Sequence, residues 1–305
     1  METPPEAADP AEQPNRAGPV PRTIWSLAKA SVRGAQHEKD GRVNQDSANF
    51  DLLLGLNAAI VVVSDGHGSA KCFRSDIGSQ LAVSVALRVT SMMLGGASDG
   101  IEAAVPKLPR ILVRRWREAI AQHLAEHPFS EEEAAQLQPI GNEPLHDDGL
   151  PERHLTLPYG ATVAVAAVTP NHVILAQLGD GKIMVLYDGD ETPVVPLADD
   201  GNVSSLDTFS LCMPDAADRF RCLATPHRGS LPRLILATTD GYPDSFRTEQ
   251  DFLQVGADLH QAIRQRGLDA VALDLPRWLQ ESSREGSGDD CSLAMIWRDD
   301  GEVLR

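Results

Sequence analysis

The sequence is poor in cysteine, in basic residues and in long apolar runs. Lys and Arg number 27 against 44 Asp and Glu, and the resulting formal charge of −17 argues against nucleic acid or an anionic membrane as a partner. No apolar run approaches the roughly 18 residues of a membrane-spanning helix. Four cysteines show neither metal-knuckle spacing nor the density of a disulfide scaffold, so free thiols in a cytoplasmic, reducing compartment are expected. They are Cys72, Cys212, Cys222 and Cys291.

The N-terminal segment differs from the rest of the chain. Residues 1–22 have no basic stretch followed by an apolar one, so a secretory signal is not expected, and their prolines predict a disordered tail. The whole chain is 42% hydrophobic and 23% charged, as in globular proteins. We therefore expect one folded domain over residues 23–300.

Short β-rich runs alternate with turn signals, without a regular strand-helix repeat. This pattern favours an α+β sandwich over a doubly wound parallel sheet. The β-branched run Ala58–Val63 is typical of a strand that is covered on both faces. The predicted strands are 58–63, 161–168, 172–178, 182–187, 234–237 and 292–297.

Helical periodicity is present in three places. One helix is predicted over Ser75–Met93 with Ser75 as its cap, a second opens at Pro109, and the last covers Gln261–Arg284. The stretch 127–158 has prolines and little apolar periodicity, which predicts a loop insertion. A second irregular, flap-like region is predicted over residues 190–232.

Asp-Gly occurs nine times in the chain, and turn formation explains most instances. Asp65, Asp180 and Asp240 differ, because each directly follows an apolar strand. Asp289 reverses the order and precedes a strand, while Asp46 closes an N-terminal polar segment. Strand ends converge in space, so these carboxylates are expected at one rim of the fold.

Carboxylates gathered at one rim repel one another unless their pKa values rise or cations bind. With no paired cysteines, oxygen ligands select hard ions such as Mg²⁺ or Mn²⁺. Two such ions about 3.5 to 4 Å apart can share a hydroxide and hold a phosphoryl group for in-line attack.

Six sequence blocks occur in an order that resembles the metal-dependent protein Ser/Thr phosphatases of type 2C, the PPM family. The resemblance runs from about His37 to Trp297, and the spelling Gly34-x-x-His37 is most similar to a bacterial branch. The blocks are Asn44-Gln45-Asp46, Ser64-Asp65-Gly66-His67-Gly68, Tyr159-Gly160-Ala161-Thr162, Leu178-Gly179-Asp180, Thr239-Asp240-Gly241 and Gly288-Asp289-Asp290-Cys291-Ser292.

The resemblance implies a four-layer α/β/β/α sandwich of two antiparallel sheets flanked by helices, with residues 23–300 as the catalytic domain. It also implies two Mg²⁺ or Mn²⁺ ions at one end of the sheets. Asp65 matches the carboxylate that bridges both ions, and the Gly66 carbonyl matches a ligand of one of them. Asp240 and Asp289 match the other direct ligands.

Other positions match less closely. Asp46 matches an acidic position that holds an ion directly or through water, although Gln45 replaces a Glu found in some relatives. Asp180 matches the ligand of a third, weaker ion. His67 corresponds to the general acid that protonates the departing alkoxide, and Arg42 lies one residue from the usual place of a phosphate-binding arginine.

The expected activity is hydrolysis of phosphoserine and phosphothreonine in proteins, by attack of a metal-bridging hydroxide. Two alternatives remain open: an inactive scaffold that binds a phosphorylated partner, and a hydrolase of small phosphoesters. His37 is expected either to orient phosphate or water or to make a local hydrogen bond, and Asp290 to lie in a turn or behind the ligands. The substrate, the partner kinase and the oligomeric state are not specified by these patterns.

Overall fold

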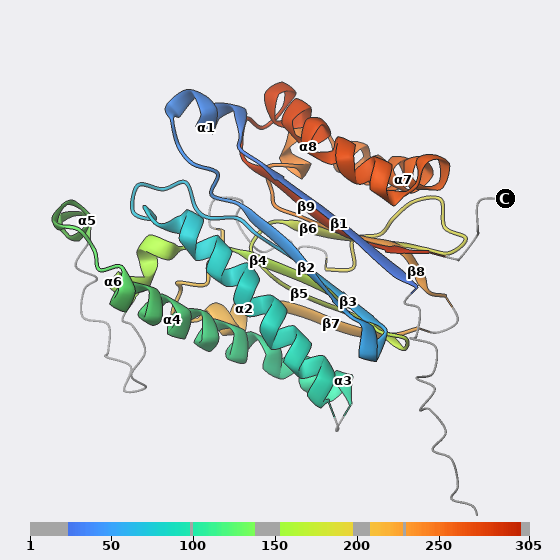
Figure 1. Cartoon of the computed structure of the whole chain (residues 1–305), viewed down its shortest axis with the longest axis horizontal. Helices are drawn as coiled ribbons and strands as arrows, with labels where there is room; N and C mark the ends of the chain where they lie inside the picture. Colours follow the sequence, from blue (N-terminus) through green and yellow to red (C-terminus); the bar gives the residue numbers. More distant parts are fainter. Residues whose placement is uncertain (1–23, 98–99, 138–152, 198–207, 228–229, 300–305) are drawn as a thin grey trace, which may run out of the picture.

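The computed structural model describes residues 24–97, 100–137, 153–197, 208–227 and 230–299. The tail predicted over residues 1–22 lies outside these ranges. Two antiparallel sheets lie face to face, and helices cover both outer faces (Figure 1). The predicted four-layer α/β/β/α fold is therefore confirmed.

The two sheets contain nine described strands. The five-stranded sheet is formed, in spatial order, by β2 (Ser47–Leu53), β3 (Ala58–Ser64), β4 (Val163–Val168), β5 (His172–Leu178) and β7 (Arg221–Pro226). The four-stranded sheet is formed by β1 (Trp25–Val32), β9 (Cys291–Arg298), β8 (Pro232–Thr238) and β6 (Lys182–Tyr187).

Each sheet has its own pair of long helices. The pair α2 (Ser75–Gly96) and α4 (Leu108–Glu126) covers the five-stranded sheet, while α7 (Glu249–Arg266) and α8 (Leu268–Glu285) cover the four-stranded sheet (Figure 1). The short helices are α1 (Ala35–Asp40), α3 (Ile101–Ala104), α5 (Glu131–Gln136) and α6 (Arg153–Thr156).

The alternation of side chains along β3 shows how the layers are held together. Ala58, Ile60 and Val62 enter the core under α2 and α4, whereas their neighbours Val61 and Val63 enter the core between the two sheets. Successive strand residues point to opposite faces, so a continuous apolar run fits a strand covered on both sides. A third core fills the space between the four-stranded sheet and α7 and α8.

Six predicted strands are present with bounds close to those expected, but β1, β2 and β7 were not predicted. The strand β7 lies inside the region expected to be irregular over residues 190–232. It is a strand because it pairs along its length with β5, from His172↔Pro226 to Gln177↔Arg221. Its own sequence carries little strand signal.

The helix predictions also need correction. The pattern over Gln261–Arg284 is two helices, which separate at Gly267 with φ 82°. Ser75 is the first residue of α2 rather than its cap, and its hydroxyl accepts a hydrogen bond from the Gln45 side chain. The loop predicted over residues 127–158 contains α5 and α6.

The helix α2 is long and apolar enough, by length and composition, to cross a membrane. Its most apolar window has a mean hydropathy of 1.4, and half of that window is buried inside the fold. Its inner face contacts β2, β3 and α4. A buried helix of a layered domain meets the same criteria, so this property is explained by the core that α2 helps to form.

Candidate metal centre

Two of the five predicted acidic ligands come from the five-stranded sheet. Asp65 directly follows β3, and Asp46 directly precedes β2. The strands β2 and β3 are antiparallel, with Ser47 opposite Ser64, so the two aspartates leave the sheet at the same end. The Asp65 amide is fixed there because it donates to the Thr162 hydroxyl at 3.0 Å.

The other three aspartates come from the four-stranded sheet and its connections. Asp240 follows β8 and Asp289 precedes β9, and the register that sets Thr238 opposite Leu293 brings both to one end. Asp180 lies in the turn between β5 and β6. Burial raises the pKa of Asp240, and repulsion from Asp180 and Asp289 raises it further, so the carboxylates are electrostatic neighbours.

A cleft of ≈ 380 Å³ opens above this end of the sheets. The His37 ring also forms part of its wall. Most of the site residues predicted from the sequence line this cleft. They are Arg42, Asp65, Gly66, His67, Asp240 and Asp289.

Asp46 and Asp180 lie beside the cleft rather than on its wall. Asp46 is 7% exposed, and its Oδ2 accepts a 2.6 Å hydrogen bond from the Thr239 hydroxyl. Asp180 is half-buried, and its Oδ2 accepts from the Thr208 hydroxyl at 2.6 Å. The structure thus brings all five aspartates to one place, three on the cleft wall and two at its edge.

The cluster is electrostatically costly in the absence of cations. Burial, followed by repulsion from Asp240 and Asp46, raises the pKa of Asp65 well above its usual range. Burial also raises the pKa of Asp46 well above normal, despite the hydrogen bond from Thr239. The pKa of Asp240 is raised to about 7, by burial first and then by Asp180 and Asp289. Such a group of carboxylates is stabilised by binding divalent cations.

Unpartnered oxygens supply a second indication of a cation site. Asp46 Oδ1 and Asp180 Oδ1 are buried and have no hydrogen-bond partner among the residues that the structure describes. Buried polar atoms of native proteins are nearly always satisfied, so such atoms need a ligand, an ion or water. The donor set consists of oxygens, which fits Mg²⁺ or Mn²⁺.

Gly66 is held too tightly for any side chain. A Cβ at this position would lie 2.4 Å from the Ser75 carbonyl oxygen and 2.7 Å from that of Gln45. The Gly66 amide donates to the Gln45 carbonyl at 3.2 Å, and Gly66 also bridges to Ala161. This packing places the Gly66 backbone on the cleft wall next to Asp65.

His67 is half-buried, and its backbone amide donates to the Gly160 carbonyl at 3.1 Å. Burial lowers the pKa of its imidazole, and the charge of Asp180 opposes this effect. Arg42 is exposed and lines the cleft, so its guanidinium is accessible from there. It forms an ion pair with Asp40 at 3.0 Å. Both residues can therefore reach a ligand in the cleft.

Gln45 stands at the position where some relatives have a glutamate, but its side chain does not join the acidic cluster. Its side-chain amide donates to the Ser75 hydroxyl at 2.5 Å, which directs it toward the start of α2. The Gln45 carbonyl accepts from the Ser79 hydroxyl at 2.5 Å. This residue joins the segment that carries Asp46 to the helix layer.

The sequence did not identify several residues that support the cluster. Thr239 and Thr208 each hold one carboxylate, and Asp244 lies close enough for Asp180 to raise its pKa, after burial. Asp290, expected in a turn or behind the ligands, is a buried anchor whose two oxygens accept backbone N–H groups. Only Asp244 had a sequence signal, because it lies four residues after Asp240 in a polar turn.

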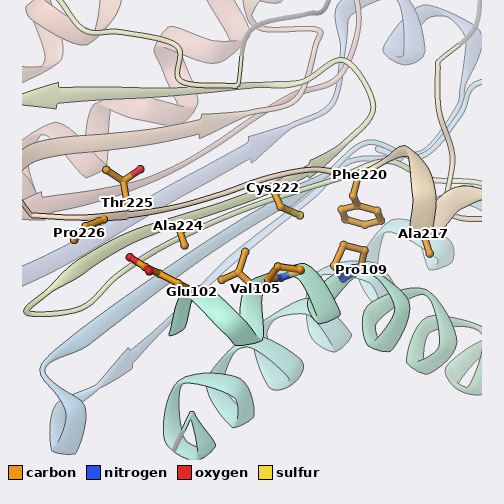
Figure 2. A pocket seen from close by; sticks show the side chains of 10 residues that line it. Glu102, Val105, Pro109, Ala217, Phe220, Cys222, Ala224, Thr225 and Pro226 are labelled. Carbon is orange, nitrogen blue, oxygen red and sulfur yellow. The ribbon is translucent and has the colours of Figure 1, made fainter. Parts of the chain in front are cut away.

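A larger cavity lies elsewhere and contains none of the clustered aspartates. It has a volume of ≈ 710 Å³ and lies between the edge strand β7 and the helices α3 and α4 (Figure 2). Its wall is mixed: Val105, Pro109 and Phe220 contribute apolar surface, and Glu102 and Thr225 contribute polar atoms. It offers no group for acid, base or metal chemistry comparable to the acidic cleft.

Comparisons with known proteins agree with the fold. The profile of the family described as protein phosphatase 2C matches residues 33–280. No match is found among curated proteins. The fold is similar to that of the serine/threonine phosphatase Stp1 from Staphylococcus aureus, with a TM-score of 0.56 and 12% identity over 90% of this chain and 94% of that one.

Two further similar structures are those of the phosphatase PstP. The Mycobacterium tuberculosis PstP/Ppp structure has a TM-score of 0.52 and 17% identity, over 90% of this chain and 99% of that one. The catalytic domain of PstP in complex with two manganese ions has a TM-score of 0.51 and 17% identity, over 90% and 97%. At these identities the likeness concerns the fold.

Proposed function

The chain belongs to the protein phosphatase 2C family, and on that premise we propose that it is a cytoplasmic, metal-dependent phosphatase acting on phosphoserine and phosphothreonine in proteins. The observation that carries this proposal is the cluster of buried, mutually repelling carboxylates on one cleft. The ligands of the metal ions would be the Gly66 carbonyl and the carboxylates of Asp46, Asp65, Asp180, Asp240 and Asp289.

Two bound ions, with a third, weaker one at Asp180, would supply charge neutralisation at the phosphoryl oxygens and activation of a water for attack. Asp65 is an electrostatic neighbour of Asp46, which comes from the five-stranded sheet, and of Asp240, which comes from the four-stranded sheet. This position supports a role for Asp65 in holding both ions. Protonation of the leaving group and orientation of the phosphate would be carried out by side chains on the cleft wall.

His67 and Arg42 would act on the substrate itself. The half-buried imidazole of His67 would donate a proton to the serine or threonine oxygen as the phosphoryl bond breaks; burial lowers its pKa, and the charge of Asp180 would favour the protonated form. Arg42 would orient the phosphate through its planar guanidinium, after exchanging its exposed contact with Asp40 for the substrate. The charge of −17 supports a protein substrate rather than nucleic acid or a membrane surface.

The proposal is tested by metal titration with turnover of a phosphothreonine peptide as the readout. We expect no phosphate release in EDTA, saturable activation by Mn²⁺ or Mg²⁺, and a loss of several orders of magnitude in Asp65→Asn with the fold intact by circular dichroism. Asp251→Asn, at the exposed start of α7, is the matched control and should retain full activity.

The same assay separates the alternatives. A protein that binds Mn²⁺ and a phosphopeptide without releasing phosphate would be a scaffold. Faster turnover of nucleotides or sugar phosphates than of phosphopeptides would indicate a small-molecule phosphohydrolase. Near-normal activity of Asp65→Asn at saturating Mn²⁺ would contradict the proposed site.

A further inference from the structure

His37 is a buried histidine on the wall of the acidic cleft, and the function proposed above does not use it. It lies in α1 and is 7% exposed. Its Nε2 lies 3.6 Å from Asp289 Oδ1, and its Nδ1 lies 2.9 Å from Asp290 Oδ2. One ligand atom from each of the three residues falls within 4.8 Å of the others.

Both carboxylate oxygens of Asp290 accept hydrogen bonds from backbone amides. Its Oδ1 accepts from the Gly34 amide at 2.6 Å, and its Oδ2 accepts from the Gln45 amide at 2.6 Å. A Cβ on Gly34 would lie 2.3 Å from the carbonyl carbon of Asp289, so α1 begins in direct contact with this turn. Asp290 therefore anchors the segment that carries His37 through both of its carboxylate oxygens.

Neither ring nitrogen of His37 makes a hydrogen bond within the described part of the chain. Nδ1 is close to Asp290 Oδ2, but its N–H is not aligned with that oxygen, and this buried nitrogen has no hydrogen-bond partner within the described part of the chain. Nε2 is directed toward Asp289, whose side chain is half exposed to the cleft. An imidazole that is only structural would be expected to hydrogen-bond through at least one nitrogen.

The distance between His37 Nε2 and Asp289 Oδ1 fits two ligands of one ion. With bonds of about 2.1 Å, neighbouring ligands are about 3.0 Å apart in an octahedral site and about 3.5 Å apart in a tetrahedral one. The observed 3.6 Å needs only a small approach of the exposed Asp289 carboxylate.

We propose that His37 Nε2 is a nitrogen ligand of the ion that Asp289 holds, an inference that rests on the proposed function and deepens it. Nδ1 then carries the ring proton, and a small rotation of the ring would align this N–H with Asp290 Oδ2, which lies 2.9 Å from Nδ1, as in the carboxylate–histidine–metal arrangement of metal-binding imidazoles. Because nitrogen ligands favour transition metals, this ion site prefers Mn²⁺ over Mg²⁺ more strongly than an all-oxygen site would.

The test is pulsed electron paramagnetic resonance on the Mn²⁺-loaded full chain, at substoichiometric and at saturating Mn²⁺. The wild type should show a ¹⁴N modulation that changes to the ¹⁵N pattern after labelling with [¹⁵N]histidine. His37→Gln, which keeps a side chain of similar size, should lose this modulation. Its calorimetric affinity for Mn²⁺ should fall by about tenfold to a hundredfold, with a smaller loss for Mg²⁺.

His260→Gln is the matched control, because His260 is a half-buried histidine of α7 that lies against Trp297 and does not line the acidic cleft. It should keep the nitrogen modulation and the Mn²⁺ affinity. Suppose that the wild type binds Mn²⁺ but shows no nitrogen coupling, or that a coupling is present and persists in His37→Gln. His37 is then not a ligand, and the proposed function is unaffected. If the wild type binds no Mn²⁺ at all, the proposed function itself fails.

Discussion

Arg74 and Glu133 form a bidentate ion pair, with Nε to Oε1 at 2.7 Å and Nη2 to Oε2 at 2.8 Å. Arg74 precedes α2 and Glu133 lies in α5, so the pair joins segments that are 59 residues apart. The Arg74 guanidinium also donates to the Tyr159 hydroxyl at 2.8 Å and stacks on the Phe129 ring. The start of the segment expected to be a loop is thereby held against the helix layer.

This ion pair predicts an acid-sensitive contribution to stability. The hydrogen bond from Arg74 is the main cause that lowers the pKa of Glu133 from 4.5 to about 2. A carboxylate with a lowered folded-state pKa stabilises the fold above its unfolded pKa, and this stabilisation is lost as the pH falls from about 4.5 to about 2. Glu133→Gln should therefore lower the free energy of unfolding by about 1 to 3 kcal/mol at pH 7, and by less near pH 3.

Urea unfolding at the two pH values measures this difference. Glutamine preserves the hydrogen bond to the Ser130 amide, so the variant removes the ion pair and keeps the helix cap. Glu131→Gln, exposed in the same helix, should change little at either pH. A destabilisation of Glu133→Gln that does not depend on pH would contradict the role assigned to the charge.

His67→Ala should separate substrates by the quality of their leaving groups. A serine or threonine alkoxide needs a proton as it departs, whereas an aryl oxide is stable enough to leave without one. We expect kcat to fall by about 10² to 10⁴ on a phosphopeptide and far less on an aryl phosphate. Steady-state kinetics on both substrates at saturating Mn²⁺ provide the measurement, and equal losses would remove His67 as the acid.

Asp240→Asn should have opposite effects with and without metal. In metal-free protein the variant relieves repulsion from Asp180 and Asp289, so its melting temperature should be at or above that of the wild type. Mn²⁺ at a hundredfold excess over its Kd stabilises a binding protein by about 2.7 kcal/mol, and the variant should lose most of this gain.

Thermal unfolding with and without Mn²⁺ measures both effects. Asp258→Asn, on the exposed face of α7, should behave as the wild type in each condition. A full Mn²⁺-induced shift in Asp240→Asn would show that Asp240 is not a ligand.

Two glycines of α2 should respond in opposite directions to alanine. A Cβ on Gly78 would lie 1.8 Å from the Tyr159 carbonyl oxygen, so Gly78→Ala must push α2 away from the turn that precedes β4. We expect a loss of roughly 3 kcal/mol. A Cβ on Gly95 meets nothing within 4 Å, so Gly95→Ala should be neutral or stabilise by up to about 1 kcal/mol. Chemical denaturation of both variants gives the comparison.

The sequence predicted those parts of the fold whose signal is local. The run Ala58–Val63 of β3 is apolar throughout, and the turn Thr169-Pro170-Asn171 between β4 and β5 contains the residues that such turns require. The helix α5 also had a readable signal, because Ser130 and Glu133 form a capping box, but the surrounding prolines obscured it.

The strands β1, β2 and β7 had no such signal. Residues of β7 are all partly exposed, and a sheet edge needs no strong apolar alternation. Such a segment becomes a strand through hydrogen bonds to its neighbour, and the choice of neighbour is a tertiary property.

For the site, the sequence by itself determined which carboxylates stand at strand ends, and so which residues are candidates to hold metal. Only the tertiary structure decided their environment: that Thr239 and Thr208 hold two of them, that Gln45 turns toward α2, and that Asp290 fixes the segment that carries His37. The reason is physical, because a side chain's partners and its burial depend on segments brought together from all over the chain. The separation between Gly34 and Asp290 is 256 residues, a distance over which no local pattern carries information.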